Sequence, residues 1–238
     1  MRKIQFDTGK IYHIFNRGVE KRDIFLEDRD RWRFLQGLYL FNEGEGTTNL
    51  LYRLEQEKKA MNFRILKEFI VSSREERKPL VRIMADCLMP NHFHLILEEI
   101  QEGGISRFMH KFGVGYTNYF NKKYERVGSL FQGTFKAVEV EADAQLQYLL
   151  VYVNVVNPGQ LFEPNLKEDG VMDVERVLKF AREYLWGTHR EYMGIRESVI
   201  IDKGMLGEMF PSPKKYEQFA RDILLGRQID KISRLMLE

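Results

Sequence analysis

Two histidines, His92 and His94, stand two positions apart in a strand-like run of the sequence, residues 88–98. Side chains two apart on a strand point to the same face of its sheet, so both imidazoles would emerge together. Neighbouring imidazoles can bind a divalent cation, and such a cation can polarise a phosphodiester. Because an isolated His-x-His pair is more often simply two half-exposed polar residues, the surrounding sequence has to decide between the two interpretations.

A tyrosine is the second group that could do chemistry here. The segment 142–157 has the apolar spacing of a helix and carries Tyr148 and Tyr152 one turn apart. If this helix lies beside the histidine strand, a phenol could attack phosphorus and form a covalent phosphotyrosine. Three further tyrosines in an earlier helical stretch are more distant rivals, with packing as their simpler role: Tyr116, Tyr119 and Tyr124.

Composition limits the classes of protein that need to be considered. The chain has 238 residues, a formal net charge of +2 and a sequence pI near 8.5, so a nucleic-acid surface would be a local basic patch. Its single cysteine, Cys87, excludes an internal disulfide framework and fits a reducing compartment. Since no apolar run approaches the roughly 20 residues of a membrane span and no signal peptide is visible, we expect a soluble cytoplasmic protein.

The elements that must position these groups follow from hydrophobic periodicity. The pattern predicts strands at 10–18, 80–88, 93–98 and 137–140, and helices at 28–42, 105–124 and 142–157. This order is typical of a ferredoxin-like (RRM-like) α+β fold, an antiparallel sheet with packed helices, and we expect the 80–98 hairpin in the middle of the sheet. We expect one domain at 1–165, with a helix-containing insertion at about 43–79, and a C-terminal helical extension at 166–238.

Three segments together resemble the single-tyrosine HUH transposases, in particular the IS200-like and REP-associated tyrosine transposases. They are residues 89–95 (MPNHFHL), 128–137 (GSLFQGTFKA) and 147–154 (QYLLVYVN), which occur in the order that the family shows. The resemblance covers roughly residues 10–162, and the combination is far more specific than any one motif. It implies that the domain at 1–165 is catalytic.

The resemblance also implies an activity. Members of the family bind single-stranded DNA, often beside a hairpin or palindromic repeat, and cut it with one tyrosine. The products are a 5′-phosphotyrosyl bond and a free 3′-hydroxyl, and rejoining reverses the step in DNA transposition. Carried over by position, Tyr152 is the nucleophile and His92 and His94 bind the metal, Mg²⁺ or Mn²⁺. The implied setting is the prokaryotic cytoplasm, at the nucleoid, as a monomer or homodimer without membrane contact.

The chain departs from the family pattern at the third metal ligand. The family often supplies an amide one helical turn beyond its tyrosine, where this chain has Val156. Asn157 is our candidate if the helix end is irregular, and Asn154 is the alternative.

Basic residues along the chain are the candidates for contacts with DNA phosphates: Arg17, Lys111, Lys122, Lys123 and Lys136.

Other functions fit parts of the sequence. A ferredoxin-like sheet also serves RNA-recognition domains, which stack bases on sheet aromatics and need no nucleophile. A former transposase retained for binding palindromic DNA would keep the same motifs. A two-histidine phosphoesterase needs a second His-x-Ser/Thr motif, which His13, His110 and His189 do not provide, and His13 itself is expected in the core.

Overall fold

An antiparallel sheet forms the centre of the computed structural model, which describes residues 4–44, 62–72 and 77–226. Its strands are β1 (Ile11–Arg17), β2 (Val81–Met89), β3 (His92–Glu99) and β4 (Lys136–Val140), in the spatial order β2-β3-β1-β4. Helix α1 (Asp28–Leu40) connects β1 towards β2, and α4 (Gly104–Lys123) connects β3 to β4. This is the βαββαβ arrangement of a ferredoxin-like fold, so the predicted α+β class is confirmed.

The position of the β2–β3 hairpin differs from the prediction. Strand β1 pairs with both β3 and β4, which makes β1 and β3 the central strands and leaves β2 at an edge. That edge is covered by a later part of the chain. The Leu88 N–H donates to the Trp186 carbonyl at 2.7 Å, and Cys87 forms a bridge with Gly187. The crossover through α1, which sequence periodicity does not reveal, decides which strands are central.

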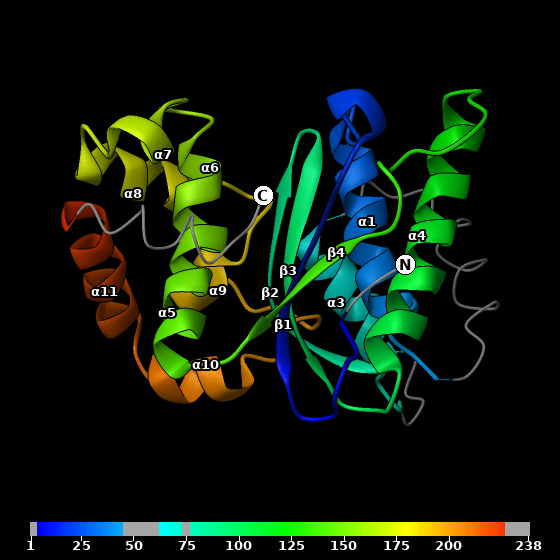
Figure 1. Cartoon of the computed structure of the whole chain (residues 1–238), viewed down its shortest axis with the longest axis horizontal. Coiled ribbons are helices and arrows are strands. Elements are labelled where there is room, and N and C mark those ends of the chain that lie inside the picture. The colour runs from blue at the N-terminus through cyan, green and yellow to red at the C-terminus, as the bar shows by residue number, and fades with distance from the viewer. Residues whose placement is uncertain (1–3, 45–61, 73–76, 227–238) are drawn as a thin grey trace.

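Helices cover both faces of the sheet (Figure 1). Helices α1, α3 (Phe63–Ser72) and α4 lie on one face. The other face is covered by the helix containing Tyr152 and by the helices that follow it. They are α5 (Asp143–Val151), the π-helical turn η2 (Tyr152–Val156), α6 (Asn157–Gly159), α7 (Leu166–Asp169), α8 (Val174–Glu183), α9 (His189–Tyr192), α10 (Gly204–Met209) and α11 (Pro213–Leu225). A short 3₁₀ turn, η1 (Val19–Lys21), follows β1.

Each face of the sheet has its own apolar core. Alternation along β1 sends Tyr12 and Ile14 into the core beneath α1 and α4, and Ile11 into the core beneath α5. The core beneath α5 also contains residues of η2, α8 and α11. The described part of the predicted extension is therefore helical and packs directly against the ferredoxin-like unit. The division at residue 165 stays a prediction. No helix in the described residues has the length and apolar character that crossing a bilayer requires.

The predicted insertion at 43–79 is only partly described. Helix α3 lies within it, and Phe63 of α3 packs edge-on against Trp32 of α1, with ring centroids 4.7 Å apart. Residues 45–61 and 73–76 of the insertion lie outside the described part of the chain.

Candidate active site

The two predicted metal-binding histidines lie together at the start of β3, on the face covered by η2. The rings of His92 and His94 have centroids 5.1 Å apart and are nearly perpendicular. His92 is half-buried, whereas His94 is 1% exposed. Burial, and then the neighbouring His92 and His13, lowers the pKa of His94 well below its ordinary value. The His94 imidazole is therefore neutral near pH 7, the form that binds a metal.

Within-chain contacts orient both rings through the same type of atom. His92 Nδ1 lies 2.6 Å from Asn91 Oδ1, and His94 Nδ1 lies 2.9 Å from His13 Nε2. A cation held by this pair would therefore be bound through the two Nε2 atoms.

The Tyr152 ring lies edge-on to His94, with ring centroids 5.7 Å apart and an interplanar angle of 89°. The same ring is 6.4 Å from the His13 ring. Its side chain is 1% exposed and belongs to the core that η2 forms with the sheet. The predicted tyrosine and the predicted histidines are thus neighbours within one chain.

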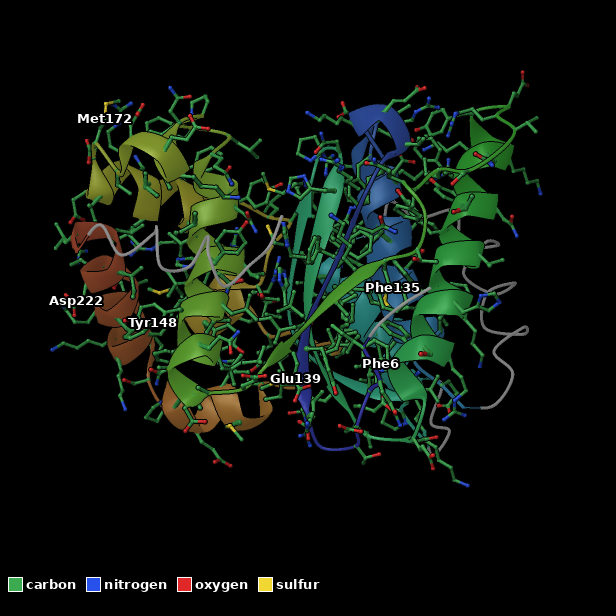
Figure 2. All side chains as sticks on the ribbon, viewed as in Figure 1. Phe6, Phe135, Glu139, Tyr148, Met172 and Asp222 are labelled. Atoms are coloured by element: carbon green, nitrogen blue, oxygen red, sulfur yellow. The ribbon has the colours of Figure 1, made fainter. Side chains whose placement is uncertain are left out.

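The rival tyrosines lie elsewhere. Tyr148 points from α5 towards α11, where its ring packs 5.8 Å from that of Phe219 (Figure 2). Tyr116, Tyr119 and Tyr124 are on the α4 side of the sheet, and their hydroxyls bond to the Ile24 carbonyl or to the Asp30 carboxylate. Since the sheet separates these three from the histidine pair, Tyr152 is the only one of the five candidates in contact with His94.

The helix carrying Tyr152 is irregular in the turn that follows this tyrosine, where a third metal ligand is predicted. Residues Tyr152–Val156 form a π turn, in which the Asn157 N–H donates to the Tyr152 carbonyl. A π turn holds one residue more than an α turn, so Asn157 rather than Val156 lies one turn beyond the tyrosine. The Asn157 side chain is fully buried, its Oδ1 accepts from Gln160, and its Nδ2 has no hydrogen-bond partner. Asn154 instead accepts from Thr188 at 2.7 Å.

This donor set is compatible with the expected cations. Among the described residues, no three His, Cys, Asp or Glu side chains form a metal-binding group. Two imidazoles would therefore be the protein donors, and the neutral amide of Asn157 stays the predicted third ligand. Oxygen ligands from a phosphodiester and water would fill the remaining coordination positions. Mn²⁺ accepts such a mixed set, and Mg²⁺ ordinarily retains waters and phosphate ligands.

Two residues of this site were not predicted. His13 was expected to be an ordinary core residue, but it bonds to His94 and stacks on it, with centroids 5.1 Å apart. The alternation of β1 puts His13 on the face opposite Tyr12 and Ile14. Only the pairing register of β1 with β3 shows that this face brings His13 beside His94. Lys167 was missed completely, although its Nζ donates to the Tyr152 hydroxyl at 2.6 Å. It belongs to α7, and no local motif marks it.

The basic residues named as DNA contacts fall into two groups. Arg17 and Lys136 are exposed at the end of the sheet that carries the histidines: Arg17 is opposite His92, and Lys136 Nζ lies 5.7 Å from the Phe15 ring centroid. Phe15 in turn stacks on His13 at 4.8 Å. The other three are on α4, across the sheet from the histidine pair: Lys111, Lys122 and Lys123.

Lys123 has a structural role that was not foreseen. Its Nζ donates at 2.6 Å to the fully buried Asp30 and also pairs with Glu27. Burial alone would raise the pKa of Asp30, but hydrogen bonds from Lys123 and Tyr124 hold that pKa below its usual value. This lysine therefore compensates a buried charge.

A pair of neighbouring substitutions separates this role from DNA binding. We expect Lys123→Ala to lower the free energy of unfolding by about 3 kcal/mol, because it leaves Asp30 with an incompletely paired buried charge. The adjacent Lys122 is exposed, and we expect Lys122→Ala to change stability by no more than about 0.5 kcal/mol. Urea unfolding of both variants checks this, and equal stabilities would contradict the role given to Lys123.

Comparison with known proteins bears on this site. Residues 52–155 match the family model described as "Transposase IS200 like". One solved structure, titled "Structure of the REP associates tyrosine transposase bound to a REP hairpin", aligns over 85% of this chain and 96% of that chain, at 11% identity and a TM-score of 0.46. No curated protein matches the sequence. The family match confirms the resemblance drawn from the motifs: residues 52–155 of this chain are similar to the IS200-like transposases.

Proposed function

We propose that this protein is a metal-dependent single-stranded DNA endonuclease and transposase that acts through a 5′-phosphotyrosine intermediate at hairpin-associated sites. The single observation that supports this most is the edge-on contact between Tyr152 and His94 in one chain. A phenol beside an imidazole pair is what nucleophilic attack on a cation-bound phosphodiester requires. The motifs and the matched family model support the same reaction.

The cleavage step is a transesterification. The Tyr152 oxygen forms a bond to phosphorus and loses its proton to solvent. The bond between phosphorus and the 3′-oxygen of the preceding nucleotide breaks, and that oxygen leaves as a 3′-hydroxyl after taking a proton from water. The DNA then carries a 5′-phosphotyrosyl linkage. Because the linkage conserves the energy of the phosphodiester, a 3′-hydroxyl can reverse the step without ATP.

The residues around the tyrosine have separate tasks. His92 and His94, with Asn157 as the third candidate, would hold Mg²⁺ or Mn²⁺, which would polarise the phosphodiester. His13 fixes the orientation of His94 through their 2.9 Å contact. Arg17 and Lys136, exposed near His92 and Phe15, would bind phosphates of the strand. Since one chain supplies both the tyrosine and the histidines, a single copy is sufficient to build the site.

A non-catalytic RNA-recognition role fits the structure less well. That mode needs aromatic side chains exposed on the open face of a sheet. Here helices cover both faces, and the sheet aromatics Tyr12, Phe15 and Phe93 are buried. A retained transposase that only binds palindromic DNA remains the second candidate, because it would keep the same site.

Identification of the products tests the proposal. The wild-type protein is incubated with Mn²⁺ and end-labelled single-stranded DNA containing a palindrome, and denaturing electrophoresis then resolves protein–DNA adducts. We expect a covalent adduct whose modified peptide, by mass spectrometry, contains Tyr152, together with a released strand that a polymerase can extend from its 3′-hydroxyl. Adducts at another tyrosine would reject the assignment, and binding without any adduct would favour the non-catalytic candidate.

A further inference from the structure

The proposed function leaves one contact unexplained: Lys167 of α7, in the C-terminal helical region, reaches the tyrosine that we propose as nucleophile. Lys167 Nζ donates to the Tyr152 hydroxyl at 2.6 Å and lies 4.6 Å from the centroid of the same ring. The lysine is half-buried, so the contact is partly removed from water. Charge-assisted hydrogen bonds of this kind are roughly twice as strong as neutral ones.

The backbone around Lys167 is fixed to the helix that carries the tyrosine. Its neighbour Leu166 is 1% exposed and packs so closely on Gly159 of α6 that a Cβ there would lie 2.9 Å from Leu166 Cδ1. The carboxylate of Glu163 accepts from the Met172 and Asp173 N–H groups and closes the loop on the other side of α7. The position of Lys167 relative to Tyr152 is therefore built into the fold.

We propose that Lys167 is a catalytic residue contributed by the C-terminal helical region, which stabilises negative charge on the Tyr152 oxygen in both cleavage and rejoining. This inference rests on the proposed function, because it assigns the charge to the phenol oxygen that attacks and later leaves phosphorus. During attack that oxygen carries negative charge, relative to the neutral phenol, as its proton leaves and before its bond to phosphorus is complete. In rejoining it departs from phosphorus with the bonding electron pair and carries the charge again. An ammonium already directed at the oxygen gains interaction energy as charge develops, which is the requirement for transition-state stabilisation.

Single-turnover kinetics with the labelled palindromic DNA and saturating Mn²⁺ test the assignment. Loss of one preorganised charge-stabilising donor typically costs 10²–10³-fold in rate, so we expect Lys167→Ala to slow adduct formation and rejoining by about 100-fold. The DNA dissociation constant should change by less than about threefold, because the contact that is removed joins Lys167 to the Tyr152 hydroxyl and not to a DNA phosphate. Lys167→Arg should retain more of the rate than Lys167→Ala.

Chemical rescue distinguishes charge stabilisation from a structural role. Methylammonium can enter the space left by Lys167→Ala and should restore part of the rate, whereas tetramethylammonium at the same ionic strength, which has no N–H donor, should not. Lys179 is an exposed lysine of α8, so Lys179→Ala is the matched control. We expect it to form and rejoin the adduct at the wild-type rates.

Four results would overturn the assignment. Adduct formation by Lys167→Ala at the wild-type rate would show that the lysine is not needed, and a faster rate would show that it restrains the tyrosine. A slower rate that methylammonium does not improve, with DNA affinity weakened in proportion, would identify a DNA contact instead. A wild-type protein that forms no adduct at all would reject the proposed function itself, and this inference with it.

Discussion

Tyr152→Phe is expected to abolish covalent attachment of DNA while leaving the fold and DNA affinity intact. The substitution removes only the phenol oxygen, and no other candidate tyrosine contacts His94. Loss of the nucleophile should lower the rate of adduct formation by roughly 10⁴-fold or more. The Phe ring keeps the packing of this buried position, so the stability cost should be about 1 kcal/mol, for the lost bond to Lys167. Denaturing electrophoresis measures the adduct, and a gel-shift assay measures binding.

Tyr148→Phe is the matched control for this prediction. Tyr148 lies on the same helix one turn earlier, but its ring packs against Phe219 on α11. We expect wild-type adduct levels from this variant. If Tyr148→Phe abolished the adduct and Tyr152→Phe did not, the nucleophile assignment would be wrong, and the helix would have to rotate before catalysis.

The sequence was sufficient to predict the elements of the sheet and to name the histidines and the tyrosine that the structure brings together in the candidate site. Period-two alternation placed His92 and His94 on one face, and the helical spacing after residue 142 placed Tyr148 and Tyr152 on one helix, from which the resemblance to the transposase family selected Tyr152. These signals are local, because each depends on side chains a few positions apart. The central position of β1 is a different matter: it depends on which strands pair, and that is decided by packing across the whole domain.

Tertiary contacts explain what the sequence could not predict. His13 and His94 are 81 positions apart and meet only through the β1–β3 register. Lys167 reaches Tyr152 because Leu166 packs on Gly159, a contact with no periodic signature. Lys123 was read as a DNA contact because it is basic, whereas its partner Asp30 lies on another helix. The π turn at Tyr152–Val156 likewise has no clear sequence signal, and it is what brings Asn157 one turn beyond the tyrosine.

Substitutions at the histidines should produce a graded loss of metal binding. We expect His94→Ala to remove Mn²⁺ binding and to lower adduct formation by about 10³-fold, since a bound cation contributes several kcal/mol to charge stabilisation. His13→Leu keeps the volume but leaves His94 Nδ1 without its 2.9 Å partner, and loss of such an orienting contact typically costs 10–100-fold in metal affinity or activity. Electron paramagnetic resonance of Mn²⁺ titrations measures binding directly, with the Tyr152→Phe background preventing cleavage of the DNA present.

Mn²⁺ affinity should fall from the parent to His13→Leu and further to His94→Ala. This order is the decisive result, because a purely structural histidine cluster would not produce it. His110→Ala, at an exposed position on α4, should bind Mn²⁺ like its parent and serves as the control. Chelation of the metal should reduce adduct formation by the wild-type protein to the level of His94→Ala. Added Mn²⁺ should restore adduct formation by the wild type, and a higher Mn²⁺ concentration should restore it in His13→Leu. If His94→Ala kept the Mn²⁺ affinity of its parent, the cation would be held elsewhere, and the histidine pair would serve only to pack against Tyr152.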